Sequence, residues 1–193
     1  MMQRTANDRL GQWRSKHLVL VGEMATGKTT VGRLLADLVG RSHLDSDELL
    51  EQRIGVSGAS FAASNGVEAL HEMELQVFTD AISEVDEAVI SPAASVLDSE
   101  DGREALLGNV VVWLDAQVEI SQKRIEEGDH RRSIDISEVE GLRSRRLPHY
   151  RDIAVLHIET GKAGPEELAT AIAESLPGFS DGRKGDSESR AIR

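Results

Sequence analysis

Short apolar runs alternate along the chain with longer segments in which apolar residues recur every three or four positions. Runs of the first kind predict buried strands, and the longer spacing predicts amphipathic helices. The strands are expected at residues 17–21, 42–45, 88–91, 110–114 and 155–158. The helices are expected at residues 27–39, 47–54, 67–85, 100–107, 117–126, 137–146 and 166–175. Strands that alternate with helices indicate an α/β fold, with a five-stranded parallel sheet covered by helices on both faces.

The two ends of the chain lack this pattern. Residues 1–15 are polar without clear periodicity and are predicted to form a flexible arm, whereas residues 178–193 are polar and glycine-rich, which is typical of a disordered tail. Residues 16–177 are expected to form one domain, and a chain of 193 residues is long enough for a sizeable core. Since aromatic residues make up only 3 % of the chain, that core must consist mainly of Leu, Val, Ile and Ala.

The chain is acidic, with a net charge of −12 at pH 7. This charge opposes binding to nucleic acid or to an anionic membrane, so neither is an expected partner. An anionic ligand would have to meet a local basic cluster, and such clusters occur at Lys123–Arg124, Arg131–Arg132 and Arg143–Arg146. The chain has no cysteine, no evident signal peptide and no apolar run near the ~18 residues of a membrane span. We therefore expect a cytoplasmic protein and a monomer.

One segment carries a nucleotide-binding motif, since Val21–Thr30 reads VGEMATGKTT and has the spacing Gly22-x4-Gly27-Lys28-Thr29. It lies between a predicted strand and a predicted helix, the context in which such a loop wraps phosphates. Backbone N–H groups and the helix N-terminus would face the phosphates, Lys28 would bridge the β- and γ-phosphates, and Thr29 would ligate Mg²⁺. The loop therefore predicts ATP or GTP as the ligand, together with Mg²⁺. The loop residues predicted to bind phosphate are Gly22, Ala25, Thr26, Gly27, Lys28, Thr29 and Thr30, with Ala25 at a position that is glycine in many such loops.

Several classes of nucleotide hydrolase are excluded because the chain lacks the sequence elements that they need. A GTPase would need an Asn-Lys-x-Asp element to read guanine, and the chain has none. An ABC-type ATPase would need Leu-Ser-Gly-Gly-Gln or a close variant, which is also missing. The strand VVVWLDA ends in Asp115-Ala116, so it lacks the catalytic Glu of a mechanical ATPase, and Asp115 is interpreted as a strand-end or helix-capping residue rather than a metal ligand. The small size instead favours a small-molecule kinase with an acceptor pocket, an orienting carboxylate and an arginine-bearing lid.

The residues from about 16 to 175 resemble the shikimate kinase family. The resemblance rests on several motifs in the same order: the phosphate loop, the Asp-Ser-Asp after the second strand, EQRIG, a GxSxAxxFAxxG-like stretch, VVVWLDA, HRRSID and RSRRLPHYRDIAVLHIET. It implies a P-loop kinase fold with strand order 2-3-1-4-5 and a mobile lid at about residues 127–136. It also implies transfer of the γ-phosphoryl group of MgATP to a hydroxyl of shikimate or a related small hydroxy acid.

The resemblance assigns roles to two carboxylates that follow the second strand. Asp47 matches the residue that contacts the acceptor hydroxyls, and a carboxylate can orient a hydroxyl and take its proton. Asp45 matches the carboxylate near Mg²⁺. The alternative interpretation is that the segment DSDE only caps the helix that follows it.

Three arginines receive roles in the same way. Arg132 matches the lid arginine that reaches the phosphates, with Arg131 as its rival, and the alternative is a solvated charged turn. Arg124 is placed to stack on adenine. Arg146 matches the arginine that binds the acceptor's carboxylate, for which the planar guanidinium is well suited because it pairs bidentately.

Two departures from the family pattern fall in the acceptor pocket. The family has a Phe-Arg pair on its long third helix, whose arginine grips the same carboxylate, and here the pair is Leu70-His71. The family also has a triple glycine after its third strand, and here Pro92, Ala93 and Ala94 occupy that stretch. His71 would replace an arginine only when protonated, and a free histidine has a pKa of ~6.5. His71 is therefore either an acceptor-binding residue or part of the pocket wall, and Ala93 and Ala94 are predicted to line the pocket.

Three functions remain open at this point. The first is a shikimate-kinase-like phosphotransferase, whose catalytic residues would be Lys28, Asp47 and Arg132. The second is a carbohydrate kinase of the gluconate kinase type, which shares the loop and the size. The third is a non-catalytic ATP-binding paralogue, which the changed glycine stretch favours and the intact loop opposes.

Overall fold

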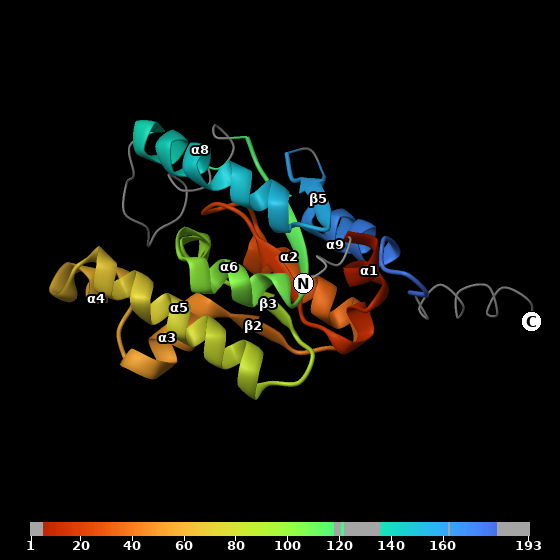
Figure 1. The fold of residues 1–193 in the computed structure, drawn as a ribbon, viewed down its shortest axis with the longest axis horizontal. Coiled ribbons are helices and arrows are strands. Elements are labelled where there is room, and N and C mark those ends of the chain that lie inside the picture. The colour runs from red at the N-terminus through yellow and green to blue at the C-terminus, as the bar shows by residue number, and fades with distance from the viewer. Residues whose placement is uncertain (1–5, 118–120, 122–135, 162, 181–193) are drawn as a thin grey trace, which may run out of the picture.

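A computed structural model describes residues 6–117, 121, 136–161 and 163–180 of the chain (Figure 1). Its strands form one five-stranded sheet in the order β2-β3-β1-β4-β5, and all of the neighbouring pairs are parallel. The order and the number of strands confirm the predicted fold. The strands are β1 (Leu18–Val21), β2 (His43–Asp45), β3 (Val89–Ser91), β4 (Val110–Asp115) and β5 (Leu156–Glu159).

The helices follow the predicted pattern closely, with the additions given below. They are α1 (Ala6–Gly11), α2 (Lys28–Val39), α3 (Ser46–Ile54), α4 (Gly58–Asn65), α5 (Val67–Glu84), α6 (Glu100–Leu107), α8 (Ile136–Ile153) and α9 (Pro165–Glu174). Two 3₁₀ helices, η1 (Trp13–Ser15) and η2 (Ala94–Asp98), complete the described elements. Gly40 ends α2 in a left-handed conformation with φ of 70°, which is the usual role of a glycine just beyond a helix.

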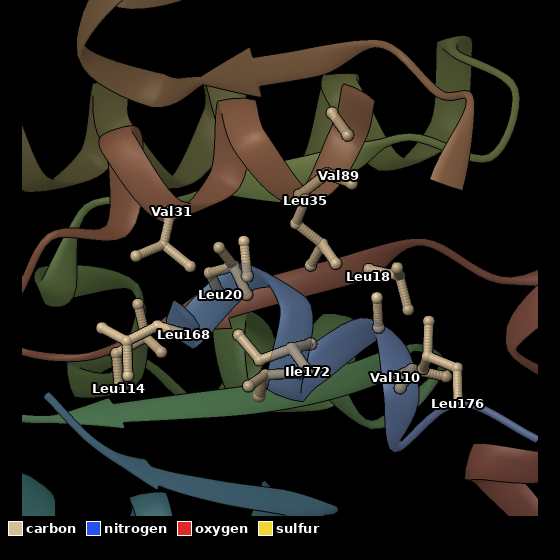
Figure 2. Close-up of a cluster of buried hydrophobic side chains, with 14 of the residues drawn as sticks. Leu18, Leu20, Val31, Leu35, Val89, Val110, Leu114, Leu168, Ile172 and Leu176 are labelled. Carbon is tan, nitrogen blue, oxygen red and sulfur yellow. The ribbon is translucent and has the colours of Figure 1, made fainter. Parts of the chain in front are cut away.

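Both faces of the sheet are buried. Successive residues of a strand point to opposite faces, so the apolar residues of the central strands contribute to one cluster on each side. Leu18 and Leu20 of β1 face a cluster that includes Leu35 of α2 and Ile172 of α9. Figure 2 shows these side chains meeting between the two helices and the sheet. Val19 and Val21 face the second cluster, which takes residues from α5, α6, α8 and η2. Leu, Val and Ile dominate both clusters, as the scarcity of aromatic residues predicts.

The prediction of a flexible arm is wrong for residues 6–15. Trp13 is 4 % exposed and belongs to the cluster on the α2–α9 side. Its indole N–H donates to the carbonyl oxygen of Pro177 at 2.9 Å, and Arg9 donates to the carbonyl oxygen of Ile153 at 2.9 Å. Figure 1 shows α1 lying beside α9. The segment is too short for a periodic pattern, and its order comes from one buried aromatic ring and from bonds to distant backbone groups.

The far end of the chain is also ordered further than predicted. Phe179, inside the expected tail of residues 178–193, packs against the same cluster as Trp13. Gly178 accepts a hydrogen bond from Arg14 at 2.7 Å. The tail prediction is therefore wrong for residues 178–180, and its remainder lies outside the described residues.

Three further elements differ from the predictions. The short helices α4 and η2 were not predicted, and α8 extends beyond the expected end at residue 146 to Ile153, through Pro148. A proline inside a helix removes one backbone hydrogen bond, which is why the pattern predicts an earlier end. The turn after Pro148 is held by the buried Tyr150 and Ile153, which are 1 % and 4 % exposed. Apart from residues 117, 121 and 136, the helix expected at 117–126 and the lid expected at 127–136 lie outside the described residues.

In a parallel sheet, ligands bind at the carboxyl ends of the strands. Here the phosphate loop follows β1, Asp45 ends β2, and η2 follows β3, so these segments meet at one edge of the sheet. Within the described residues, no helix combines the length and the apolarity that crossing a membrane requires.

Candidate active site

The segment after β1 is shaped as a phosphate loop. An added Cβ at Gly22 would lie 2.4 Å from the carbonyl oxygen of Leu114, so only glycine fits there. Gly27, with φ of 97°, precedes the first residue of α2, whose N-terminus therefore opens into the loop. The Lys28 ammonium group donates to the carbonyl oxygens of Gly22 and Glu23 at 2.9 and 3.0 Å. Lys28 thus lies folded over the loop, as a lysine that binds phosphate oxygens requires.

Ala25 adopts an unfavourable backbone conformation in this loop. Its φ is 61°, and it is the one non-glycine residue with positive φ in the part of the chain that the structure describes. A side chain in this region costs roughly 1–2 kcal/mol because Cβ approaches the following carbonyl oxygen. The loop therefore keeps a glycine-type conformation although the sequence has alanine there.

Thr29 and Asp45 meet beside the loop. The Thr29 hydroxyl donates to one carboxylate oxygen of Asp45 at 2.6 Å, and the other oxygen accepts from the backbone N–H of Asp47 at 3.0 Å. Asp45 is 5 % exposed. Both interpretations of the DSDE segment are thus compatible with the structure, since Asp45 caps α3 and also contacts the threonine expected to ligate Mg²⁺.

The oxygen atoms of Thr29 and Asp45 fit a magnesium ion. Mg²⁺ is usually bound through one or two carboxylates together with substrate phosphates and water, not by a protein cage. No group of three or more His, Cys, Asp or Glu side chains that could hold a metal occurs among the described residues. Thr29 and Asp45 would therefore supply only part of the ligands of Mg²⁺, and the nucleotide's phosphates and water would supply the rest.

The other predicted loop and acceptor residues are placed as follows. Thr26 is buried, and its hydroxyl donates to the carbonyl oxygen of Glu23 at 3.0 Å. Thr30 is exposed in the first turn of α2, and Asp47 is exposed in the first turn of α3. Asp47 thus faces solvent, whereas Asp45, two residues earlier, is buried.

Arg146 is buried, with 5 % of its surface exposed, and its guanidinium is held by two carboxylates. Nε and Nη2 donate to the two oxygens of Asp98 at 2.8 and 2.6 Å, and Nη1 donates to Glu23 at 2.8 Å. Burial by itself would lower the pKa of Arg146, but the hydrogen bonds to Asp98 and the charges of Glu23 and Asp98 raise it overall. The bidentate edge expected to bind the acceptor's carboxylate is thus bound to a carboxylate of the protein.

Glu23 is fixed from a second side by Tyr150. The Tyr150 hydroxyl lies 3.3 Å from a Glu23 oxygen, and its ring stacks on Trp113 with 5.3 Å between the centroids. Burial and the nearby charge of Glu23 raise the pKa of Tyr150 well above its usual value, so the hydroxyl stays protonated and donates. Glu23 therefore joins the phosphate loop to α8.

Glu74 of α5 is a carboxyl group whose protonation the site controls. Burial raises its pKa to about 7, against the opposing hydrogen bond from the Ser95 hydroxyl. The negative charge of Asp47 raises this pKa further, and the positive charge of Arg146 lowers it. Glu74 thus lies within electrostatic range of Asp47 and Arg146, two of the predicted acceptor-binding residues.

These groups form one connected set, which we call the acceptor-side cluster. His71 belongs to it because its charge lowers the pKa of Asp98. Burial would raise the pKa of Asp98, but the hydrogen bonds and charge of Arg146 outweigh burial, so this pKa is lowered. The cluster consists of Glu23, Asp47, His71, Glu74, Asp98 and Arg146.

The stretch Pro92-Ala93-Ala94 forms the backbone that leads into this cluster. Ala93 has φ of −58° and ψ of 147°, a conformation open to any residue, so the fold does not need glycine here. Pro92 is buried, and Ala93 and Ala94 are half-buried. The replacement of glycines therefore leaves the backbone unstrained and adds methyl groups beside Ser95.

Three predicted residues cannot be placed, because Arg124, Arg131 and Arg132 lie outside the described residues. Asp115, in contrast, is clearly placed at the end of β4. It pairs with Arg143 at 2.7 Å and with His157 at 3.2 Å. Its interpretation as a strand-end residue is confirmed.

Sequence reasoning missed Glu23, Glu74 and Asp98. Glu74 follows His71 by three residues on one helix, so helical spacing could have indicated it. Glu23 lies inside the loop motif at a variable position, and nothing around Asp98 in the sequence pairs it with Arg146, 48 residues away.

Comparisons with known proteins find relatives of this chain over most of its length. The family model for shikimate kinase matches residues 24–177. The shikimate kinase of Symbiobacterium thermophilum is 34 % identical over 167 residues, covering 83 % of this chain and 95 % of that protein. The shikimate kinase of Thermobifida fusca is 32 % identical over 166 residues, covering 84 % and 96 %.

Solved structures give the same result for the fold. Shikimate kinase from Acinetobacter baumannii in complex with shikimate has a TM-score of 0.76 at 27 % identity, covering 87 % of this chain and 94 % of that one. A gluconokinase from Sinorhizobium meliloti has a TM-score of 0.58 at 17 % identity, covering 93 % and 98 %, and at that identity only the fold is shared. Loop geometry, strand order and sequence relatives together show that this chain belongs to the shikimate kinase family of ATP-dependent small-molecule kinases.

Proposed function

We propose that this protein transfers the γ-phosphoryl group of MgATP to a hydroxyl of shikimate or of a related small hydroxy acid. The observation that carries the proposal is the meeting of Thr29 with Asp45, beside Asp47 and the phosphate loop. Family membership supports the reaction, and the complex of the Acinetobacter baumannii relative supports shikimate as the first acceptor to test. We expect the protein to act in the cytoplasm as a monomer.

On the nucleotide side, the loop and Lys28 bind the phosphates and keep them in line with the acceptor. Lys28 exchanges its two carbonyl partners for phosphate oxygens, to which a lysine contributes a concentrated positive charge. Thr29 and Asp45 would hold Mg²⁺, which neutralises phosphate charge when bound. Arg132 is proposed to reach the transferred group from the lid.

On the acceptor side, Asp47 is proposed to orient the attacking hydroxyl and to accept its proton. Its carboxylate is exposed toward solvent at the N-terminus of α3, so it is accessible to a small molecule. Arg146 is proposed to bind the acceptor's carboxylate, with His71, Ala93 and Ala94 on the pocket wall. Phosphoryl transfer needs little covalent chemistry from the protein, so positioning by these residues supplies most of the rate.

The two alternative functions are less well supported. The likeness to a gluconokinase is at 17 % identity, far below the 34 % of a shikimate kinase relative. A non-catalytic ATP-binding paralogue would need Lys28 and Thr29 for the nucleotide but would not need Asp47, whose exposed carboxylate supports the catalytic interpretation.

The test is acceptor-dependent release of ADP from MgATP with shikimate. Lys28→Ala is expected to lower kcat at least about hundredfold, since it removes a positive charge from the developing transition state. Asp47→Asn is expected to lower kcat by about 10²–10⁴ with little change in ATP affinity, because a general base contributes about that factor. Glu51→Gln, an exposed carboxylate elsewhere on α3, is the control and should keep the wild-type rate. A wild-type rate for Asp47→Asn would remove Asp47 from the mechanism.

A further inference from the structure

The guanidinium of Arg146 is occupied on the edge that recognises carboxylates. Asp98 accepts from Nε and Nη2 at 2.8 and 2.6 Å, which is the paired arrangement that an acid ligand would make with an arginine. Nη1 is bound to Glu23 at 2.8 Å. A carboxylate that enters the pocket therefore meets an arginine whose bidentate edge is already taken.

The two carboxylates on Arg146 differ in how easily they can leave. The Glu23 side chain is 11 % exposed and is also bound by Tyr150, whereas the Asp98 side chain is 38 % exposed. The Arg146 side chain between them is 6 % exposed. Asp98 is therefore the solvent-side partner, and water can solvate its carboxylate when it leaves the guanidinium, whereas Glu23 stays in place beneath it.

The charges around Arg146 determine whether a further carboxylate can bind there. The acceptor-side cluster has four carboxyl groups, on Glu23, Asp47, Glu74 and Asp98, against one guanidinium and His71. The negative charge of an acceptor's carboxylate is repelled by those carboxyl groups of the cluster that are ionised, unless it replaces one of them. If the acceptor's carboxylate takes the place of the Asp98 side chain, the number of carboxylates bound to the Arg146 guanidinium stays the same.

We propose that Asp98 is a built-in competitor for the acceptor's carboxylate, and that it sets the specificity of the pocket. In the empty protein Asp98 fills the bidentate edge of Arg146, and a hydroxy acid binds only by displacing it. This competition weakens acid acceptors and leaves uncharged hydroxylated acceptors unaffected. The inference rests on the proposed function, because it concerns the same acceptor pocket.

The test compares shikimate with its methyl ester, which keeps the ring hydroxyls and lacks the negative charge. Binding to the wild-type protein and to Asp98→Asn is measured by calorimetry in the presence of MgADP. The dissociation constant for shikimate is expected to fall at least about tenfold in Asp98→Asn. That factor equals about 1.4 kcal/mol, which is within reach of one charge-assisted hydrogen bond. The constant for the ester is expected to change less than about twofold.

Two controls separate competition from other effects. Asp101→Asn removes an exposed carboxylate three residues away, in the first turn of α6, and should leave shikimate binding unchanged. Asp98→Glu keeps the charge on a longer side chain and should keep shikimate binding near the wild-type level. It also provides a folded comparison if Asp98→Asn is unstable, because the inference then requires Asp98→Ala to bind shikimate more tightly than Asp98→Glu.

The outcomes are distinct from those for the proposed function. Unchanged shikimate affinity in Asp98→Asn, an equal gain for acid and ester, or binding of neither compound to either protein would overturn the role of Asp98. Absence of acceptor-dependent ADP release would instead count against the proposed function, and the binding comparison still decides the role of Asp98.

Discussion

At the scale of single residues, the site depends on carboxyl groups whose charge the surroundings determine. Glu74 shows this effect most simply, because burial raises its pKa to about 7 while the hydrogen bond from Ser95 opposes the rise. In the unfolded chain the same group titrates near its usual value of 4.5. The folded and unfolded states therefore bind different numbers of protons between pH 4.5 and 7.

This difference predicts a dependence of stability on pH. Between pH 4.5 and 7 the folded protein keeps a proton on Glu74 that the unfolded chain has lost, so the free energy of unfolding falls as pH rises through that window. Above pH 7 both states become ionised and the loss is complete, at roughly 3 kcal/mol for a pKa raised from 4.5 to about 7. Glu74→Gln stays neutral, so we expect it to gain that amount relative to the wild type between pH 4.5 and pH 8, measured by urea unfolding.

The control for this measurement is Glu72→Gln, an exposed residue on the same helix. Its difference from the wild type should not change with pH over the same window. A constant difference for Glu74→Gln as well would mean that Glu74 is not buried as the structure describes.

At the scale of elements, the N-terminal segment is the main departure from the sequence pattern. Trp13 ties η1 to the end of α9 by a hydrogen bond to Pro177 and by burial against the α2–α9 side of the sheet. Arg41 donates from its two terminal nitrogens to the carbonyl oxygens of Lys16 and Trp13 at 2.7 and 2.9 Å. The segment therefore acts as part of the domain.

Trp13→Ala is expected to lower the free energy of unfolding by about 3–5 kcal/mol, the usual cost of removing a buried aromatic side chain. Trp13→Phe keeps most of the packing and loses the indole hydrogen bond, so its cost should be nearer 1 kcal/mol in order of magnitude. Chemical unfolding of the full chain measures both values. If Trp13→Ala unfolds at the wild-type midpoint, the segment is the detached arm that the sequence pattern predicts.

At the scale of the whole molecule, the proposed nucleotide site joins the phosphate loop after β1 to the end of β2, so ligand binding should stabilise the entire domain. At a concentration 100 times the dissociation constant, a bound ligand adds about 2.7 kcal/mol to the free energy of unfolding. For a chain of this size, that corresponds to a rise in Tm of about 5–10 °C. We expect MgATP to produce this shift in the wild-type protein and Lys28→Ala to lose most of it at the same concentration.

Measurement by differential scanning calorimetry with and without MgATP is sufficient. The Tm of Lys28→Ala without nucleotide should stay within about 2 °C of the wild type, since the Lys28 ammonium group donates to carbonyl oxygens of its own loop and lies outside the hydrophobic core. A full shift in the variant would mean that the phosphates bind elsewhere.

The alternation of apolar runs and helical periodicity determined the number of strands and the α/β class, because a parallel sheet buried on both faces needs both patterns. The spacing in Val21–Thr30 determined the phosphate loop, because glycine positions and one lysine are local requirements. These features follow from residues close together in the chain, so the sequence alone reveals them. The family resemblance predicts Asp45 near Mg²⁺, and in the structure Asp45 accepts a hydrogen bond from Thr29, the predicted Mg²⁺ ligand.

Tertiary structure alone decided which groups surround Arg146 in the proposed acceptor pocket. Arg146 meets Glu23, 123 residues away, and Asp98, 48 residues away, so no local pattern could show that its guanidinium is occupied. Burial of Trp13 and the raised pKa of Glu74 likewise depend on segments that meet only in the folded domain. The sequence thus determined the family and the phosphate loop, and long-range contacts decided which charges surround Arg146, because burial and pairing are properties of the folded chain.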